Sequence, residues 1–194
     1  MLKHGDRLLV ATHNRGKLEE IADLLAPFDV TVVGAGDFGL HEPEETETTF
    51  AGNALLKARH AADRSGEVAL ADDSGLCVPA LQGAPGVLSA RYATLFGQEK
   101  GDANNNACLI QQLKGIEDRR AYFVCAMVWV AHADDPTPTI AQKMWWGEVI
   151  DVPQGEHGFG YDPHFWLPEH QCTAAQMPKE LKNRFSHRAQ ATQA

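Results

Sequence analysis

The segment from Ala121 to Ala131 (AYFVCAMVWVA) places the strongest constraint on the fold of this chain. Its β-branched and aromatic residues favour a strand, and apolar residues occupy both of its alternating faces. A strand of this kind lies inside a sheet that is covered on both sides. The sequence therefore predicts a central strand here, with the segment Thr139–Ile150 as its pairing partner.

Strand-like and helix-like segments alternate along the rest of the chain. We expect strands at Arg7–Ala11, Val30–Val33 and Val68–Ala71, and helices at Lys17–Leu25, at about Thr49–Asp63, from an Asp102 cap through Ala103, Ala107, Ile110 and Leu113, and near Lys179–Ala191. This order predicts an α/β fold: one domain over residues 1–194, with a central mixed twisted sheet flanked by helices. In such folds the active site lies in a cleft at the strand ends.

Composition narrows the class of protein. Of the 194 residues, 44% are hydrophobic and 22% are charged, as in soluble globular domains, and no stretch is long and apolar enough for a membrane span. Residues Met1 to Arg7 are charged and lack the pattern of a secretory leader, so we expect the cytoplasm. A net charge of -9 argues against a nucleic-acid partner but permits a small polyanionic ligand in a local pocket.

The four cysteines show no CxxC pair, which favours buried thiols over zinc ligands or disulfides. They are Cys77, Cys108, Cys125 and Cys172.

The segment THNRGK, from Thr12 to Lys17, lies between an expected strand and an expected helix. Backbone amides at a helix N-terminus and the point charge of Lys17 suit a phosphate. The segment is not a Walker A loop, because that motif requires Gly where Ala11 stands and Ser or Thr where Leu18 stands. A plain structural turn is the alternative.

Two adjacent carboxylates, Asp72 and Asp73, follow the strand that we expect at Val68–Ala71. A divalent cation relieves the repulsion between such groups, and Mg²⁺ prefers one or two carboxylates together with phosphate oxygens. Glu44 and Glu45 are candidates for the remaining ligands. The alternative is a turn in which Asp caps its own backbone.

The segment GFGYDP, from Gly158 to Pro163, combines glycines that permit close backbone approach with aromatic rings that can stack on a base. A tight turn with Phe159 in the core is the alternative. The last helix then carries Lys182, Ser186, His187 and Arg188. Its Lys and Arg side chains suit a phosphate or a carbonyl oxygen. The alternative is that these basic residues only interact with the helix dipole. Trp145 and Trp146 point to opposite faces of a strand, so at most one can serve as a base platform.

These residues stand in ordered blocks that resemble the inosine triphosphate pyrophosphatase family, the Ham1-like or RdgB-like noncanonical purine NTP pyrophosphatases. The blocks span nearly the whole chain: ATHNRGKLEE, TFAGNALLKARHAA, ADDSGLCVPALQGAPGVLSARYA, GFGYDPHFWLP and KNRFSHRAQA. The resemblance implies hydrolysis of ITP, dITP and XTP to monophosphate and pyrophosphate. It also implies an ITPase-like (Maf/Ham1) fold, Mg²⁺ as cofactor, and a homodimer.

The resemblance also implies a role for each matching residue. The set is Thr12, His13, Asn14, Arg15, Gly16 and Lys17 on the triphosphate, Ser74 on the substrate, Phe159, Gly160, Tyr161 and Asp162 around the nucleoside, Lys182 on the ligand, and His187 and Arg188 at the base. Asp73 is implied as general base and magnesium ligand, with Glu45 as a further metal ligand. Our mechanism adds Asp72 as an alternative that orients the water, and Lys17 as the charge that neutralises the leaving oxygens.

The chain departs from the family pattern at Gly52, Leu88 and Gln176, and it ends soon after SHRAQA. Gly52 removes a carboxylate from a helix that the family places near the metal. Three alternative functions remain for the chain. They are a Maf-type pyrophosphatase that prefers other bases, a nucleotide-binding sensor without turnover, and an NAD-binding protein. The last is disfavoured because no GxGxxG follows the first strand.

Overall fold

Seven strands hydrogen-bond into one sheet, in the order β2-β1-β3-β4-β5-β6-β7, in the computed structural model of the chain. The structure describes residues 7–194; residues 1–6, on which part of the expectation about a leader rests, lie outside it. The strands are β1 Arg7–Val10, β2 Thr31–Gly34, β3 Ala69–Cys77, β4 Arg120–Val130, β5 Thr139–Val149, β6 Phe165–Leu167 and β7 Cys172–Thr173. β1 runs parallel to β2 and β3, whereas β6 is antiparallel to β5 and β7, so the predicted mixed sheet is confirmed.

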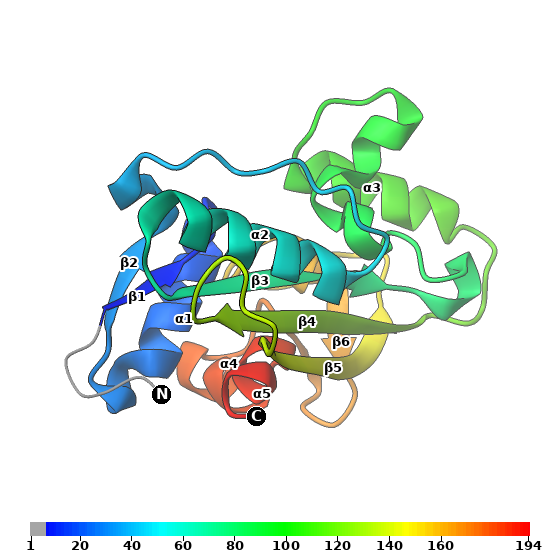
Figure 1. Cartoon of the computed structure of the whole chain (residues 1–194). Coiled ribbons are helices and arrows are strands. Elements are labelled where there is room, and N and C mark those ends of the chain that lie inside the picture. The colour runs from blue at the N-terminus through cyan, green and yellow to red at the C-terminus, as the bar shows by residue number, and fades with distance from the viewer. Residues whose placement is uncertain (1–6) are drawn as a thin grey trace. The chain divides into compact units, whose positions relative to one another are not determined.

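The α-helices lie between the first four strands of the chain and after its last strand (Figure 1). The α-helices are α1 Arg15–Leu25, α2 Phe50–Ser65, α3 Asp102–Gln112, α4 Lys179–Phe185 and α5 His187–Thr192. Short 3-10 segments are η1 Ala26–Phe28, η2 Ala35–Phe38, η3 Pro79–Leu81, η4 Gly86–Phe96 and η5 Asp162–His164. The predicted α/β class is confirmed.

The chain divides into two compact units, each with its own core. Unit 1 comprises Met1–Asp73, Cys125–Lys143 and Arg188–Ala194, and unit 2 comprises Ser74–Val124 and Met144–His187. The expectation of one domain stays a prediction.

In unit 1, alternate strand residues face two different helical layers. Leu9 of β1 and Ala71 of β3 pack with the alanines of α2, whereas Leu8 and Leu70 pack with Ile21 of α1. Helix α2 accordingly lies on one face of these strands and α1 on the other (Figure 1). Because side chains alternate along a strand, the face of any residue in β3 follows from its position relative to Ala71.

β4 is the strand that the apolar run predicts. Its residues from Phe123 to Val128 are all buried, and it stands fourth in the sheet with β5 beside it, which confirms both expectations. On β5, Trp145 is 7% exposed and Trp146 is 55% exposed, so the two rings do point to opposite faces.

Helix α3 of unit 2 differs from the prediction at its cap, and its buried face includes an asparagine. Ala103 and Ala107 are exposed, whereas Asn105, Cys108 and Leu109 are buried. Asn105 faces inward because its side-chain amide pairs with the backbone of η4, accepting from Ala93 N and donating to Ala90 O. The helix is also capped by Gly101 rather than by the Asp102 side chain. The Asp102 carboxylate accepts a hydrogen bond from Gly160 N instead, at 2.8 Å.

Two element boundaries also differ from the prediction. β3 does not end at Ala71 but continues through the carboxylates to Cys77. The single helix expected near Lys179–Ala191 is broken at Ser186, whose backbone is extended, with ψ of 157°. Periodicity does not reveal this break because residues before and after it, among them Lys182 and Arg188, are buried.

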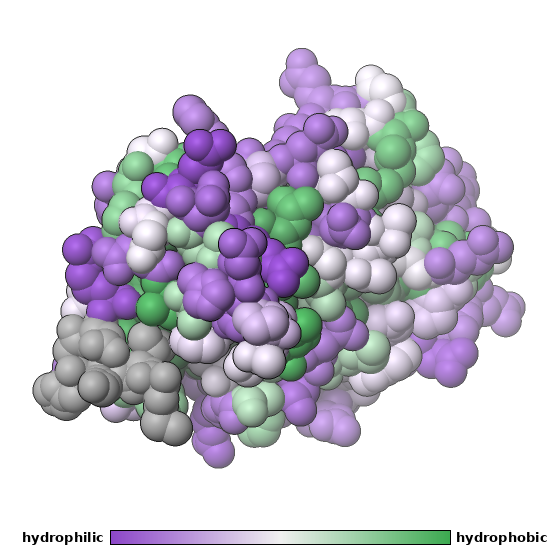
Figure 2. All heavy atoms as spheres, viewed as in Figure 1, coloured by the Kyte–Doolittle hydropathy of each residue, from purple (hydrophilic) through white to green (hydrophobic). Residues whose placement is uncertain are grey.

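Three of the thiols, Cys77, Cys108 and Cys125, are buried, as predicted, and none of the four cysteines forms a disulfide within residues 7–194. No helix in this range is long and apolar enough to cross a membrane. On the face shown in Figure 2, hydrophilic side chains predominate and hydrophobic ones occur in small groups.

Candidate active site

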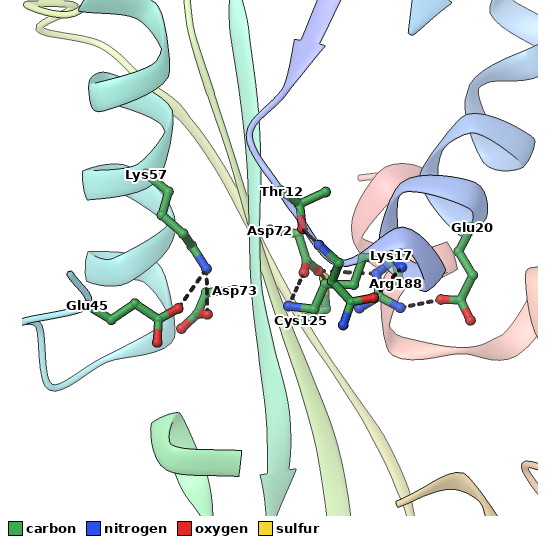
Figure 3. Close-up of polar contacts among 10 residues, drawn as sticks. Thr12, Lys17, Glu20, Glu45, Lys57, Asp72, Asp73, Cys125 and Arg188 are labelled. Carbon is green, nitrogen blue, oxygen red and sulfur yellow. Dashed lines mark hydrogen bonds and ion pairs between the residues drawn. The ribbon is translucent and has the colours of Figure 1, made fainter. Parts of the chain in front are cut away.

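Asp72 and Asp73 lie on opposite faces of β3. Asp73 shares the α2 face with Ala71, and Asp72 shares the α1 face with Leu70, as their alternation on the strand requires (Figure 3). The interpretation in which Asp72 and Asp73 together supply half of one metal site is therefore wrong, because the two side chains point to opposite faces. It assumed a loop at this point, where the chain remains a strand.

On the α2 face, a buried ammonium group joins two carboxylates. Lys57 Nζ of α2 lies 2.8 Å from Asp73 Oδ1 and 3.0 Å from Glu45 Oε1 (Figure 3). Asp73 is 5% exposed, and its second oxygen, Oδ2, is buried without a hydrogen-bond partner among residues 7–194. An orphaned carboxylate oxygen of this kind calls for a further cation or donor.

On this face, burial and neighbouring charges shift the pKa values of Asp73 and Lys57 in opposite directions. Burial raises the pKa of Asp73 to about 6, although Lys57 favours the ionised form. Burial lowers the pKa of Lys57, but Asp73 and Glu45 outweigh it, so the pKa lies above its ordinary value and the ammonium stays charged. A carboxylate with a pKa near 6 is ionised at neutral pH and still basic enough to accept a proton from water.

On the opposite face, the buried Asp72 is the centre of a network of charged side chains. Its Oδ1 lies 2.6 Å from Lys17 Nζ, and its Oδ2 accepts from Arg188 Nε at 3.2 Å and from Cys125 Sγ at 3.0 Å. Arg188 extends the network to Glu20 of α1 (Figure 3). Burial opposes the ionisation of Asp72, but Arg188 and Lys17 together hold its pKa well below the usual range. Asp72 is thus a permanent anion that fixes Lys17.

The loop before α1 is ordered by its own side chains. Thr12 Oγ1 accepts from Asn14 N at 3.1 Å, and Asn14 Oδ1 caps the helix by accepting from Lys17 N at 3.0 Å. The exposed His13 ring contacts Leu40 O through Nε2, and Arg15 is exposed and pairs with Glu19. Of the predicted triphosphate contacts, Lys17 forms an ion pair with Asp72.

In unit 2, Lys182 and Asp162 form a second buried ion pair. Lys182 Nζ lies 2.7 Å from Asp162 Oδ2, which also accepts from Phe159 N at 3.1 Å. The ammonium stands 5.4 Å from the centre of the Phe159 ring. Gly158 has a φ of 77°, and a Cβ there would overlap Asp162 Oδ2, so glycine is required where the loop wraps this pair.

Tyr161 and His187 are positioned by the core of unit 2. Tyr161 is buried, and its hydroxyl donates to Ser89 O at 2.8 Å. Its ring therefore serves the core in this structure, and not an exposed base platform. His187 stacks on Phe123 with ring centres 4.8 Å apart. Phe159, which is half-buried, is the aromatic ring of the predicted set that remains accessible.

Within residues 7–194, no group of three or more His, Cys, Asp or Glu side chains could hold a metal ion. The pair of Asp73 and Glu45 nonetheless fits Mg²⁺, because both offer hard oxygen ligands and Asp73 Oδ2 lacks a partner in this range. Mg²⁺ commonly takes one or two carboxylates from a protein, and phosphate and water then complete its shell.

A sequence model of the Ham1 family matches residues 8–194. The chain belongs to the Ham1 family. It is 53% identical over 188 residues to the dITP/XTP pyrophosphatase of Burkholderia pseudomallei, covering 97% of this chain and 90% of that protein. It is 56% identical over 185 residues to the protein of the same name from Ralstonia nicotianae, covering 95% and 92%. The predicted family is confirmed.

Solved structures of Ham1 proteins share this fold. The Ham1 protein of Coxiella burnetii superposes with a TM-score of 0.88 at 41% identity, covering 96% of this chain and 94% of that one. The Staphylococcus aureus Ham1 protein gives a TM-score of 0.83 at 38% identity, with the same coverage.

The predicted residues of this Ham1 chain gather in three groups. Asp73 with Glu45, and Asp72 with Lys17 and Arg188, lie in unit 1, and Phe159, Asp162 and Lys182 lie together in unit 2. The sequence motifs do not assign a role to three further members of these groups, which are Lys57, Glu20 and the Cys125 thiol. Lys57 carries a signal in the sequence, because it interrupts the inward face of α2 that Ala54, Ala58 and Ala61 define.

Proposed function

We propose that this Ham1 chain hydrolyses noncanonical purine nucleoside triphosphates (ITP, dITP and XTP) to the monophosphate and pyrophosphate, and so removes deaminated purines from the nucleotide pool. The relatives named dITP/XTP pyrophosphatase support the proposal, since they match nearly the whole chain. The observation that carries it is Asp73: a buried carboxylate with a pKa of about 6 and one unpartnered oxygen, beside a second carboxylate and an ammonium.

Mg²⁺ is the proposed cofactor, with Asp73 and Glu45 as its protein ligands. When bound, the ion would neutralise phosphate charge and make a bound water more acidic. Asp73 accepts the proton of the water that attacks the α-phosphorus, a role that its raised pKa suits.

The Asp72 network has a different task in this proposal. Asp72 holds the Lys17 ammonium at 2.6 Å, where the side chain is 14% exposed at the start of α1. Lys17 and the amides of the Thr12–Gly16 loop then neutralise charge on the phosphate oxygens. Asp72 itself does not take the proton, because its pKa lies too low for a base at neutral pH.

Nucleoside recognition is assigned to unit 2. Phe159 offers an aromatic face, and Lys182 and His187 offer donors to a 6-oxopurine, with Ser74 as a further substrate contact. Donors that pair with a base oxygen are left without an acceptor opposite the 6-amino group of adenine, which disfavours adenine nucleotides. Arg188 is the exception among the predicted base contacts, because Asp72 and Glu20 already engage its guanidinium in unit 1.

A homodimer and a cytoplasmic location, both implied by the family resemblance or the sequence, complete the proposal. Light scattering of the purified chain tests the first, and cell fractionation tests the second.

The direct test is to incubate the chain and Mg²⁺ with dITP, XTP, dGTP and dATP and to separate the products by chromatography. We expect monophosphate and pyrophosphate from dITP and XTP, little from the others, and loss of turnover in Asp73→Asn. Asp63→Asn, an exposed change on α2, is the matched control and should stay active. Binding of dITP without cleavage would replace the proposal with a nucleotide sensor, and release of orthophosphate would show that another bond is cut.

A further inference from the structure

Lys57 is an unusual residue for its position. It is 3% exposed and lies among the buried residues of α2, which are otherwise Asn53 and the alanines Ala54, Ala58, Ala61 and Ala62. Burying an ammonium is costly unless anions surround it, and here Asp73 and Glu45 do so. The side chain therefore stabilises the metal-free chain by keeping these two carboxylates from facing each other unneutralised.

The same contacts put Lys57 in competition with a metal ion. Its ammonium engages Asp73 Oδ1 and Glu45 Oε1, which belong to the two carboxylates that suit a divalent cation. Two carboxylates and one ammonium leave a net charge of -1 on this face, and Asp73 Oδ2 is buried without a partner within residues 7–194. The face thus attracts a cation but already contains one positive charge, which repels another over a few ångströms.

We propose that Lys57 is a resident counter-ion that weakens divalent-metal binding to Asp73 and Glu45 until a phosphate ligand arrives. A divalent cation can engage both carboxylates only when the Lys57 ammonium gives up at least one of them. An incoming phosphate offsets the repulsion because its oxygens attract both cations. The inference rests on the proposed function in that it concerns the same carboxylates, and it predicts a chain that takes up metal weakly without nucleotide.

The experiment is calorimetric titration of the full chain with Mn²⁺ in the absence of nucleotide, for the wild type and three variants. Lys57→Gln removes the charge, and we expect it to bind Mn²⁺ about tenfold more tightly or better. Lys57→Arg keeps the charge and should resemble the wild type. Arg59→Gln, an exposed change on the same helix, also removes one positive charge and should have little effect, which controls for net charge. Equal or weaker binding by Lys57→Gln would overturn the proposal.

A second measurement covers the case in which Lys57→Gln is unstable. The melting temperature of each protein is recorded in metal-free buffer and in saturating Mn²⁺. We expect Lys57→Gln to melt below the wild type without metal and the difference to shrink with Mn²⁺, because the metal replaces the lost charge. An unchanged difference would mean that Lys57 only fills space.

Neither measurement uses turnover, so the two proposals fail separately. If Lys57→Gln binds Mn²⁺ more tightly but the wild-type chain leaves dITP intact, the counter-ion proposal stands and the proposed hydrolase function is wrong. Hydrolysis of dITP with unchanged Mn²⁺ binding would do the reverse.

Discussion

At the scale of single residues, two adjacent aspartates differ in chemistry because their partners differ. Asp72 faces Lys17 and Arg188, which keep it ionised, whereas Asp73 faces one ammonium and retains an unpartnered oxygen within the described chain. The first carboxylate organises cations, and the second is available for proton transfer. Their pKa values move in opposite directions for this reason.

The two aspartates should therefore respond differently to neutralisation. Asp72→Asn leaves the buried Arg188 and the partly buried Lys17 without their shared anion, and we expect a loss of about 3 kcal/mol or more in unfolding free energy. Asp73→Asn relieves a buried charge that burial disfavours and leaves Lys57 paired with Glu45, so we expect a change within about 1 kcal/mol. Urea unfolding in metal-free buffer measures both values, and equal losses would contradict the assignment.

Cys125 gives a second test at this scale, because its thiol donates to Asp72. Cys125→Ser keeps a donor and should exceed Cys125→Ala in unfolding free energy by about 1 kcal/mol. Cys108 is the matched control, because it is buried among apolar side chains of unit 2. There Cys108→Ser should be less stable than Cys108→Ala, since the buried hydroxyl has no carboxylate to which it can donate. Thermal unfolding of the four variants decides the matter, and the same order at both sites would refute the role of the thiol.

At the scale of elements, β3 depends on a close approach to η4. A Cβ on Gly75 would lie 2.7 Å from Gly86 O and would also overlap Ser89, whose hydroxyl accepts from Leu76 N. The strand can continue past the aspartates because no side chain at Gly75 obstructs this contact. Strand propensity alone gives no sign of it, which is why the sequence predicts an end at Ala71.

Gly75→Ala should consequently destabilise the chain by about 2 kcal/mol or more, because backbone as well as side chain must move. Gly36→Ala is the control: it is exposed, and a Cβ there meets nothing within 4 Å. We expect a change of about 0.5 kcal/mol or less for it. Chemical unfolding of both variants checks the difference, and a neutral Gly75→Ala would show that η4 moves freely.

At the scale of the whole molecule, the unfolding free energy should depend on pH through the titration of Asp73. Its pKa is about 6 in the folded chain and 3.8 as the ordinary value, so the folded state binds this proton more readily. The contribution of Asp73 to stability therefore grows as the pH falls through about 6 and is lost as the pH rises. Asp72, with its lowered pKa, contributes above its ordinary value and loses that contribution in stronger acid.

The comparison of wild type with Asp73→Asn isolates this effect. Between about pH 7 and about pH 5, the wild type should gain roughly 1 kcal/mol in unfolding free energy relative to the variant. Metal-free urea titrations at both pH values measure it. A constant difference would place the pKa of Asp73 near its ordinary value.

The whole fold was more predictable from sequence than the site. The apolar run predicts the buried strand β4, and the sequence also predicts the helix α2. The break at Ser186 and the extension of β3 depend on distant partners, which periodicity does not encode. Motif likeness found Lys17 and Asp73 but not Lys57, because a buried lysine becomes meaningful only when its two carboxylates are seen beside it.

The alternation of β3 also constrains how this chain can change in length. Deleting one residue ahead of Asp72 would exchange the two aspartates between the sides of the strand, so that each met the other's partners. A change of two residues would restore the sides. A gene that loses a single codon here loses both networks at once, whereas many substitutions elsewhere in the strand leave them in place. We therefore expect insertions and deletions among relatives to fall outside this strand.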